Sequence, residues 1–281
     1  MKTNKIAWIT DSTATLSKEF IERNNIYIIP LYINFGDESY RENIDISAED
    51  FYVKLSNSKE LPKTSQPSIG EFINLYEKLQ EEYTHAIAIH ASSALTGTYQ
   101  SSMSASQTTG FHVDVIDSKN GSFALGQMIE RGVELEETGL KYEEIVEKLR
   151  ELPNKSRLYM APGSLEQLYK GGRVSSTQAF LSQLINLKLV IKFDDGKAVL
   201  SEKIRTDKKV KRRLFEIFDE EAHLVKRASV IHGNVSDLAS IWRDELEQLY
   251  PQIEFTTTMF SPVPGTHTGQ GTIGISWINE K

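Results

Sequence analysis

The sequence contains no cysteine among its 281 residues. That absence excludes disulfide bonds, thiolate metal sites and a cysteine nucleophile, and it fits a reducing compartment. The chain also has no uninterrupted apolar run near the roughly 18 residues that a membrane-spanning helix needs, and no basic segment followed by an apolar one at its start. We therefore expect a soluble, cytoplasmic protein without stable membrane insertion.

Basic residues are too few for a surface that binds nucleic acid. Lysine and arginine number 32 against 39 acidic residues, which gives a net charge of −7. Binding to a phosphate backbone needs a basic face, so we expect no nucleic-acid partner. One basic concentration does occur, between residues 203 and 213. Such runs are most often solvated helix faces, and contact with a partner is the less common alternative.

Several motifs of catalysis and cofactor binding are missing as well. There is no Walker A sequence and no G-x-S-x-G elbow. Residues 269–274 (Gly-Gln-Gly-Thr-Ile-Gly) match the dinucleotide fingerprint by letter, but too few residues follow to complete the βαβ unit that this motif requires. The six histidines show no metal-ligand spacing. We therefore expect no cofactor and no metal site.

Apolar runs and helical patterns alternate along the chain. Hydrophobic residues make up 39% and charged residues 25%, which is typical of a globular protein. Strand, helix and strand patterns follow one another over residues 6–35, the unit of a parallel sheet. Turn chemistry at residues 153–156 (Pro-Asn-Lys-Ser) marks the best boundary. We predict two α/β domains, residues 1–155 with a mostly parallel, Rossmann-like sheet and residues 156–281 with a mixed sheet and helices.

Residues 85–100 combine a buried strand with a polar turn. A short apolar run, Ala86 to Ile89, leads through a hydroxyl-rich segment into a helical pattern that begins near Gly97. In a parallel α/β sheet, ligands bind beyond the carboxyl ends of the strands, where hydroxyls and helix N–H groups meet. An exposed helix N-terminus favours a negative group by about 0.3–1 kcal/mol. The hydroxyls of residues 92–98 thus predict an anion site, with ordinary helix capping as an equally good interpretation.

Local patterns also predict individual elements. A second strand is expected over residues 27–35, and Ser47 and Ser68 each have the spacing of a helix N-cap. An apolar helix is expected to end near Leu187. Asp-Asp-Gly at residues 194–196 lies between two apolar strands and predicts a β-hairpin.

A helix is also expected over residues 237–249. Its apolar residues recur at helical spacing, which predicts an amphipathic helix with one face in the core. The side chains expected to point inward are Leu238, Ile241, Trp242 and Leu249.

The C-terminal region places a histidine between two threonines, with residues 265–269 reading Gly-Thr-His-Thr-Gly. Glycine lets a backbone approach a ligand closely, so His267 is a candidate ligand contact, although a turn before the last strand explains the same residues slightly better. With Ser92 or Ser93, His267 could also form a nucleophile and its base. The missing elbow motif weighs against a hydrolase.

Seven short motifs occur in one order from the first strand to the last. They are Thr-Asp-Ser-Thr-Ala (residues 10–14), Pro-Leu-Tyr-Ile (30–33), Thr-Ser-Gln-Pro-Ser (64–68), Ser-Ser-Ala-Leu-Thr-Gly-Thr-Tyr-Gln-Ser (92–101), Val-Ile-Asp-Ser (115–118), Lys-Gly-Gly-Arg-Val-Ser (170–175) and Gly-Thr-His-Thr-Gly (265–269). Together, in this order and spacing, they resemble the DegV family.

This resemblance implies two α/β domains that bind one long-chain fatty acid between them, with no catalysis by the chain itself. Some members of the family are the acyl-carrying subunit of a bacterial fatty acid kinase, so the resemblance also implies a separate ATP-dependent kinase partner. The matching motifs place the fatty-acid carboxylate on Thr64 and Ser93, with Ser92 close behind and His267 near the head group.

The same resemblance implies roles for three further residues. Arg173 of the Gly-Gly-Arg motif, Arg205 after the hairpin and Thr266 match positions at the ligand mouth or at the surface that docks the partner. For Arg205, this favours the partner-facing interpretation of the basic run.

Two alternatives to a fatty-acid carrier remain open. One is a serine-dependent esterase or thioesterase that uses Ser93 and His267, and the other is a module that binds a different small carboxylate. The energetics suit the carrier, because each buried methylene contributes about 0.8 kcal/mol and about ten of them offer on the order of 8 kcal/mol before binding costs. A few hydroxyls then need only orient and satisfy the carboxylate.

Overall fold

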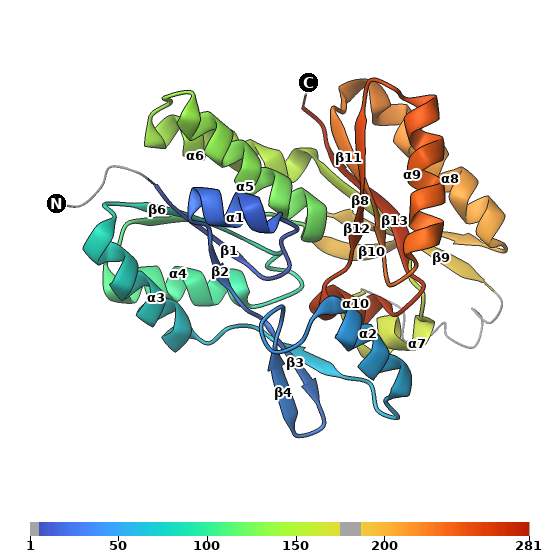
Figure 1. Cartoon of the computed structure of the whole chain (residues 1–281), viewed down its shortest axis with the longest axis horizontal. Coiled ribbons are helices and arrows are strands. Elements are labelled where there is room, and N and C mark those ends of the chain that lie inside the picture. Colours follow the sequence, from blue (N-terminus) through green and yellow to red (C-terminus); the bar gives the residue numbers. More distant parts are fainter. Residues whose placement is uncertain (1–5, 175–186, 281) are drawn as a thin grey trace.

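A computed structural model describes residues 6–174 and 187–280 and contains two main β-sheets, each covered by helices (Figure 1). One sheet has four parallel strands and the other has six strands of mixed direction. The predicted α/β class, with a parallel sheet in the first half and a mixed sheet in the second, is confirmed. The predicted helix that ends near Leu187 lies outside the described residues. No helix in the described part is long and apolar enough to cross a bilayer.

The four-stranded sheet is fully parallel. In spatial order its strands are β2 (Tyr27–Ile29), β1 (Ala7–Asp11), β6 (Ala86–His90) and β7 (Val113–Asp117). Helices α1 (Lys18–Asn24), α5 (Ser122–Glu137) and α6 (Tyr142–Lys155) lie on one face, and α3 (Ile69–Glu82) and α4 (Thr98–Thr109) lie on the other (Figure 1).

Strand β6 has an unbroken run of apolar residues because both of its faces are buried. Ile87 and Ile89 pack into the core under α5 and α6, and Ala86 and Ala88 pack into the core under α3 and α4. A strand buried on both faces reads as an unbroken apolar run. The predicted strand and the helix that follows it are confirmed, and the carboxyl end of β6 points toward the second sheet.

The six-stranded sheet is mixed. In spatial order its strands are β10 (Lys197–Ile204), β9 (Lys188–Asp194), β8 (Ser156–Ala161), β13 (Ile273–Ile278), β11 (Arg227–His232) and β12 (Glu254–Met259). Only the β11–β12 pair is parallel. Helices α8 (Asp207–Glu221) and α9 (Ser236–Leu249) contribute to the core of this sheet, and α7 (Leu165–Lys170) packs against α10 (Pro262–Thr268).

The predicted hairpin is confirmed. Strands β9 and β10 pair antiparallel, and the two residues at their turn, Asp195 and Gly196, have φ angles of 46° and 79°. Two consecutive left-handed residues match the twist of a hairpin, which is why Asp-Gly is favoured there. The predicted domain boundary coincides with a change of element, since Lys155 ends α6 and Ser156 begins β8, but the division into domains stays a prediction.

The single strand predicted over residues 27–35 is wrong. The chain forms β2, breaks at Pro30, and then forms β3 (Tyr32–Phe35) in a separate antiparallel sheet with β4 (Glu38–Arg41) and β5 (Lys63–Ser65). Pro30 has no N–H to donate to a neighbouring strand, so the pairing stops there.

Two other expectations need correction. Residues 262–268 form helix α10 and not a glycine-rich turn. In α9, Leu238, Ile241 and Leu249 are 42%, 58% and 57% exposed, so three of the four residues expected inside are outside. The buried stripe of α9 follows a different helical phase, and its members are Ala239, Trp242 and Leu246.

The caps predicted at Ser47 and Ser68 are confirmed, before helix α2 (Ala48–Asn57) and α3 respectively.

Glu42, which follows β4, joins segments from both halves of the chain. Its side chain is 1% exposed. One carboxylate oxygen accepts a hydrogen bond from the Ser12 hydroxyl at the end of β1, and the other accepts from the Val263 N–H at the start of α10, at 2.7 Å. The Ser12 oxygen in turn accepts from the Leu31 N–H at 2.9 Å. These contacts hold α10 against the end of the four-stranded sheet.

Burial raises the pKa of Glu42 from 4.5 to about 7. Between these values the folded protein binds this proton more tightly than the unfolded chain does, so stability falls as the pH rises through 7, by on the order of 3 kcal/mol. We expect the Glu42→Gln variant to lack this loss. Urea unfolding should therefore show that the stability of the variant relative to wild type is higher at pH 8 than at pH 5.

The exposed Glu49 on α2 provides the control, because Glu49→Gln makes the same chemical change at the surface. The pH-dependent difference should be absent in that variant. A Glu42→Gln variant whose stability follows wild type in parallel from pH 5 to pH 8 would show that Glu42 does not hold a proton in the fold.

Candidate ligand-binding site

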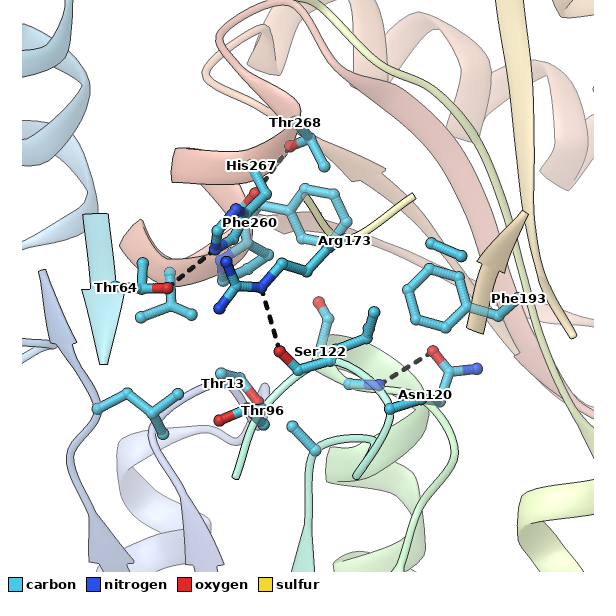
Figure 2. A pocket seen from close by; sticks show the side chains of 18 of the residues that line it. Thr13, Thr64, Thr96, Asn120, Ser122, Arg173, Phe193, Phe260, His267 and Thr268 are labelled. Atoms are coloured by element: carbon cyan, nitrogen blue, oxygen red, sulfur yellow. Dashed lines mark hydrogen bonds between the residues drawn. The ribbon is translucent and has the colours of Figure 1, made fainter. Parts of the chain in front are cut away.

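A cavity of about 430 Å³ lies between the carboxyl ends of β1 and β6 and the second sheet. Its lining combines polar and apolar side chains, with Thr64, Arg173 and His267 on one side and Phe193 on the other (Figure 2). Polar side chains at the cavity include Thr13, Thr64, Ser93, Asn120, Arg173 and His267. Apolar side chains include Leu158, Met160, Leu168, Val174, Phe193 and Phe260.

Thr64 and His267 come from opposite halves of the chain and meet at the cavity. Thr64 lies in β5 and His267 in α10, and Thr64 Oγ1 is 2.9 Å from His267 Nε2. His267 Nδ1 is buried without a hydrogen-bond partner in the described part of the protein. If Nε2 carries the proton and donates it to Thr64, the Thr64 hydroxyl proton is free to bind an acceptor in the cavity.

The imidazole of His267 is neutral at physiological pH. Burial, together with the smaller effect of the positive charge of Arg173, lowers its pKa from 6.5 to about 4. Figure 2 shows the Arg173 guanidinium beside the Thr64–His267 pair. Arg173 donates to the carbonyl of Gly171 at 2.7 Å and to that of Leu95 at 3.3 Å, so it bridges the two halves of the chain. The fixed positive charge at this end therefore belongs to arginine.

Ser93 also lines the cavity and is exposed to it. Its hydroxyl donates to one oxygen of Asp117, and its N–H is 3.2 Å from the other. A serine has one hydroxyl proton, so binding a second acceptor requires that it rotate away from Asp117. No hydrogen bond joins Ser93 to His267 among the described residues, and the nucleophile–base contact of a serine hydrolase is therefore not formed.

Ser92 occupies a different place from the one the sequence suggests. It is completely buried, does not line the cavity, and donates its hydroxyl to the carbonyl of Gly196 at 2.7 Å. Nearby, Lys119 forms an ion pair with Asp195 at 2.6 Å. Both contacts hold the turn of the β9–β10 hairpin against the end of the first sheet. Ser92 therefore stabilises the hairpin and does not contact the cavity.

Two further predicted residues lie away from the cavity wall. Thr266 is 3% exposed, and its hydroxyl donates to the carbonyl of Pro262 one turn earlier in α10. Its own carbonyl accepts from Gln167 on α7 at 3.1 Å, which fixes α10 against α7. Arg205 follows β10, is exposed to solvent, and does not contribute to the cavity.

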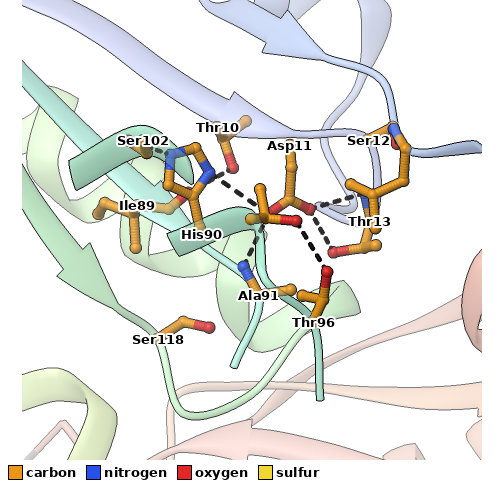
Figure 3. A network of polar contacts seen from close by, with 12 residues as sticks. Thr10, Asp11, Ser12, Thr13, Ile89, His90, Ala91, Thr96, Ser102 and Ser118 are labelled. Atoms are coloured by element: carbon orange, nitrogen blue, oxygen red, sulfur yellow. Dashed lines mark hydrogen bonds and ion pairs between the residues drawn. The ribbon is translucent and has the colours of Figure 1, made fainter. Parts of the chain in front are cut away.

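A buried carboxylate that sequence reasoning did not assign to the site organises its floor (Figure 3). Asp11, at the end of β1, accepts from the Ala91 N–H at 2.7 Å and from both the N–H and the hydroxyl of Thr13. It also lies 3.4 Å from His90 Nδ1, and His90 Nε2 lies 3.0 Å from the Ser102 hydroxyl oxygen. Thr13 and Ala91 both line the cavity. The signal for this network was the Asp-Ser-Thr sequence at a strand end.

The described residues contain no group of three or more histidine and acidic side chains arranged to hold a metal ion. The polar end of the cavity instead offers hydroxyl donors, a neutral imidazole and a guanidinium. Such a set suits an anionic oxygen group, and a carboxylate in particular.

Comparison with known proteins identifies the family. A family model described as "Uncharacterised protein, DegV family" matches residues 5–280. This chain belongs to the DegV family. The DegV protein of Bacillus subtilis is 41% identical over 276 residues, which cover 97% of this chain and 98% of that protein.

Solved DegV structures share the fold over its whole length. The crystal structure of B. subtilis DegV, described as a fatty acid binding protein, superposes with a TM-score of 0.90 at 38% identity and covers 99% of this chain and 100% of that chain. A DegV family protein from Thermus thermophilus, described for its fatty acid binding, gives a TM-score of 0.90 at 31% identity, with 98% and 99% covered. The family resemblance found in the sequence is confirmed.

The pKa of His267 can be measured directly. We expect the imidazole in the free protein to titrate near pH 4 in an NMR pH series, because it is buried beside a positive charge. Arg173→Gln should raise that pKa by removing the charge, and Arg173→Lys should leave it closer to wild type. A wild-type histidine that titrates near 6.5, or an unchanged pKa in Arg173→Gln, would contradict this description of the site.

Proposed function

We propose that this protein binds one long-chain fatty acid, with the carboxylate at the Thr64–His267 end of the cavity and the tail along the apolar wall. The observation that carries the proposal is a cavity whose lining combines hydroxyl, imidazole and guanidinium donors with apolar side chains, and in which Thr64 and His267 lie on the side opposite Phe193 (Figure 2). A volume of about 430 Å³ falls within the usual range of ligand pockets. The descriptions of the B. subtilis and T. thermophilus DegV proteins as fatty acid binders support it.

The head group binds through hydroxyls and charge. A buried carboxylate needs donors, because each unpaired polar group costs free energy on transfer from water. Thr64 supplies one hydroxyl proton, and Ser93 supplies another once it rotates away from Asp117. Arg173 supplies a positive charge beside Thr64. His267 acts through Thr64, whose hydroxyl it orients.

The tail supplies most of the affinity. Each methylene removed from water contributes about 0.8 kcal/mol, so the total grows with chain length until the cavity is full. Only the part that exceeds the cost of association appears as affinity. A carrier with these properties retains its ligand without covalent chemistry.

The arrangement does not favour the esterase alternative. Ser93 donates to Asp117, and His267 contacts Thr64, so the serine and the histidine act in separate hydrogen bonds. Hydrolysis of a chromogenic acyl ester that disappears in Ser93→Ala would reverse this conclusion.

Substitution of the two hydroxyls tests the head-group site. Thr64→Ala and Ser93→Ala should each weaken fatty-acid binding by about 10- to 100-fold, because each removes a hydrogen bond to a charged group. Mass spectrometry of an organic extract identifies the ligand that copurifies, and titration of delipidated protein with that fatty acid gives the affinities.

Ser106→Ala on α4 is the matched control, since it removes a hydroxyl that donates to a backbone carbonyl and does not line the cavity. It should cost about 1 kcal/mol of stability and leave the affinity near wild type. Unchanged affinity in the Thr64→Ala, Ser93→Ala double variant would refute the site. Wild-type protein that takes up no fatty acid from a mixture would refute the function.

We further propose that the bound carboxylate is presented to a separate kinase subunit, which contributes the nucleotide and forms the acyl phosphate. The family resemblance supports this role, and so does the exposed basic surface that begins at Arg205 and continues along the first turns of α8. An acidic or phosphate-bearing partner surface would complement it.

Substitution of Arg205 distinguishes fatty-acid binding from presentation to the kinase subunit. Arg205→Ala should leave fatty-acid affinity unchanged, because the residue lies outside the cavity, and should slow acyl phosphate formation by the partner. Arg23→Ala on α1 removes an exposed arginine from the other half of the chain and should affect neither. Equal phosphorylation rates for wild type and both variants would exclude a docking role for Arg205.

A further inference from the structure

Phe193 lies at the side of the cavity away from the head-group donors. It belongs to β9, is partly buried, and packs with the apolar cluster that includes Leu158 and Met160. Figure 2 shows Phe193 on one side of the cavity and the Thr64–His267 pair on the opposite side. A tail that starts at Thr64 and follows the apolar wall therefore runs toward this ring.

A second cavity, of about 490 Å³, shares Phe193 with the first. In the described part of the chain, Phe193 is the one residue that lines both cavities. The second cavity is strongly polar, and its charged side chains are Lys119, Arg157, Lys192, Asp194, Asp195 and Glu221. A methyl-terminated tail that crossed Phe193 would displace water from charged groups without replacing their hydrogen bonds, which is unfavourable.

The strand that carries Phe193 is held in place at its turn. Gly196 accepts from Ser92, and Asp195 pairs with Lys119, so the hairpin is fastened to the first sheet at two points. A Cβ atom on Gly196 would lie 2.6 Å from the Ser92 hydroxyl oxygen, which shows how closely the two segments approach. Phe193 pairs with Ala198 across the hairpin, and the small Ala198 side chain also lines the first cavity. The ring is thus part of a fixed wall.

We propose that Phe193 closes the tail end of the cavity and sets the longest acyl chain that the protein accepts. This inference rests on the proposed fatty-acid function and adds its chain-length specificity. The ligand class that follows is a saturated or unsaturated monocarboxylate with an apolar end. Fatty acids with a terminal hydroxyl are rejected in wild type, because that hydroxyl would meet the ring without a hydrogen-bond partner.

The test is an affinity series with delipidated protein and saturated fatty acids of increasing length. In wild type, affinity should rise by about fourfold per methylene up to an optimum and then fall. Phe193→Ala should move the optimum to longer chains by two or more carbons, because the tail then passes the former wall. It should also raise the affinity for the terminally hydroxylated analogue of the wild-type optimum, because the hydroxyl reaches the polar cavity.

Two further variants keep the test decisive if Phe193→Ala folds poorly. Phe193→Leu should give a smaller shift in the same direction, and Ala198→Val should shorten the optimum by adding volume beside the ring. Phe215→Ala on α8 is the matched control, since it truncates a partly buried phenylalanine remote from the cavity and should leave the optimum in place.

The outcomes separate the two proposals. A wild-type optimum that is the same in Phe193→Ala, Phe193→Leu and Ala198→Val would overturn the role of Phe193 and leave fatty-acid binding intact. Wild-type protein that binds no member of the series would overturn the proposed function itself.

Discussion

The placement of the cavity walls depends on the hydrogen bonds of the buried Glu42 side chain. It lies where the end of β1, the start of β3 and the first turn of α10 converge, and it accepts hydrogen bonds from Ser12 and Val263. A buried carboxyl is tolerated only where such donors surround it. Because α10 carries His267, the same contact that satisfies Glu42 also positions the histidine opposite Thr64.

Asp11 has a similar part in the first sheet. Its two oxygens bind backbone N–H groups from the loops after β1 and β6, which then present Thr13 and Ala91 to the cavity. Neither buried acid lines the cavity itself. They fix the backbone of these loops before any ligand binds, which would reduce the conformational entropy that the loops lose on binding. In the proposed function, polar groups held by the fold orient the head group, and the apolar area buried by the tail supplies most of the affinity.

Local sequence was sufficient where a local rule decides the structure. The buried strand Ala86–His90, the capping serines and the Asp-Gly turn of the β9–β10 hairpin follow from residues within a few positions of one another. The prediction of one long strand over residues 27–35 was wrong because Pro30, which has no N–H to donate, separates β2 from β3. The prediction of the buried face of α9 was wrong because Leu238, Ile241 and Leu249 share a helical stripe that does not pack against the core.

Motifs in the sequence predicted the proposed head-group residues, but they did not predict which residues these contact. Thr64 and His267 are 203 positions apart, and Ser92 and Gly196 are 104 apart, so no local pattern reports that they touch. Adjacent serines look alike in sequence, yet in the turn after β6 Ser92 contacts the hairpin and Ser93 lines the cavity. The position of Phe193 also depends on residues far apart in the sequence, because the β9–β10 turn that follows it is held against the first sheet by Ser92 and Lys119. In the proposed function, specificity for the ligand's length depends on the contact between the two halves. Specificity for its charge depends on residues of both halves, Thr64 from the first and Arg173 and His267 from the second.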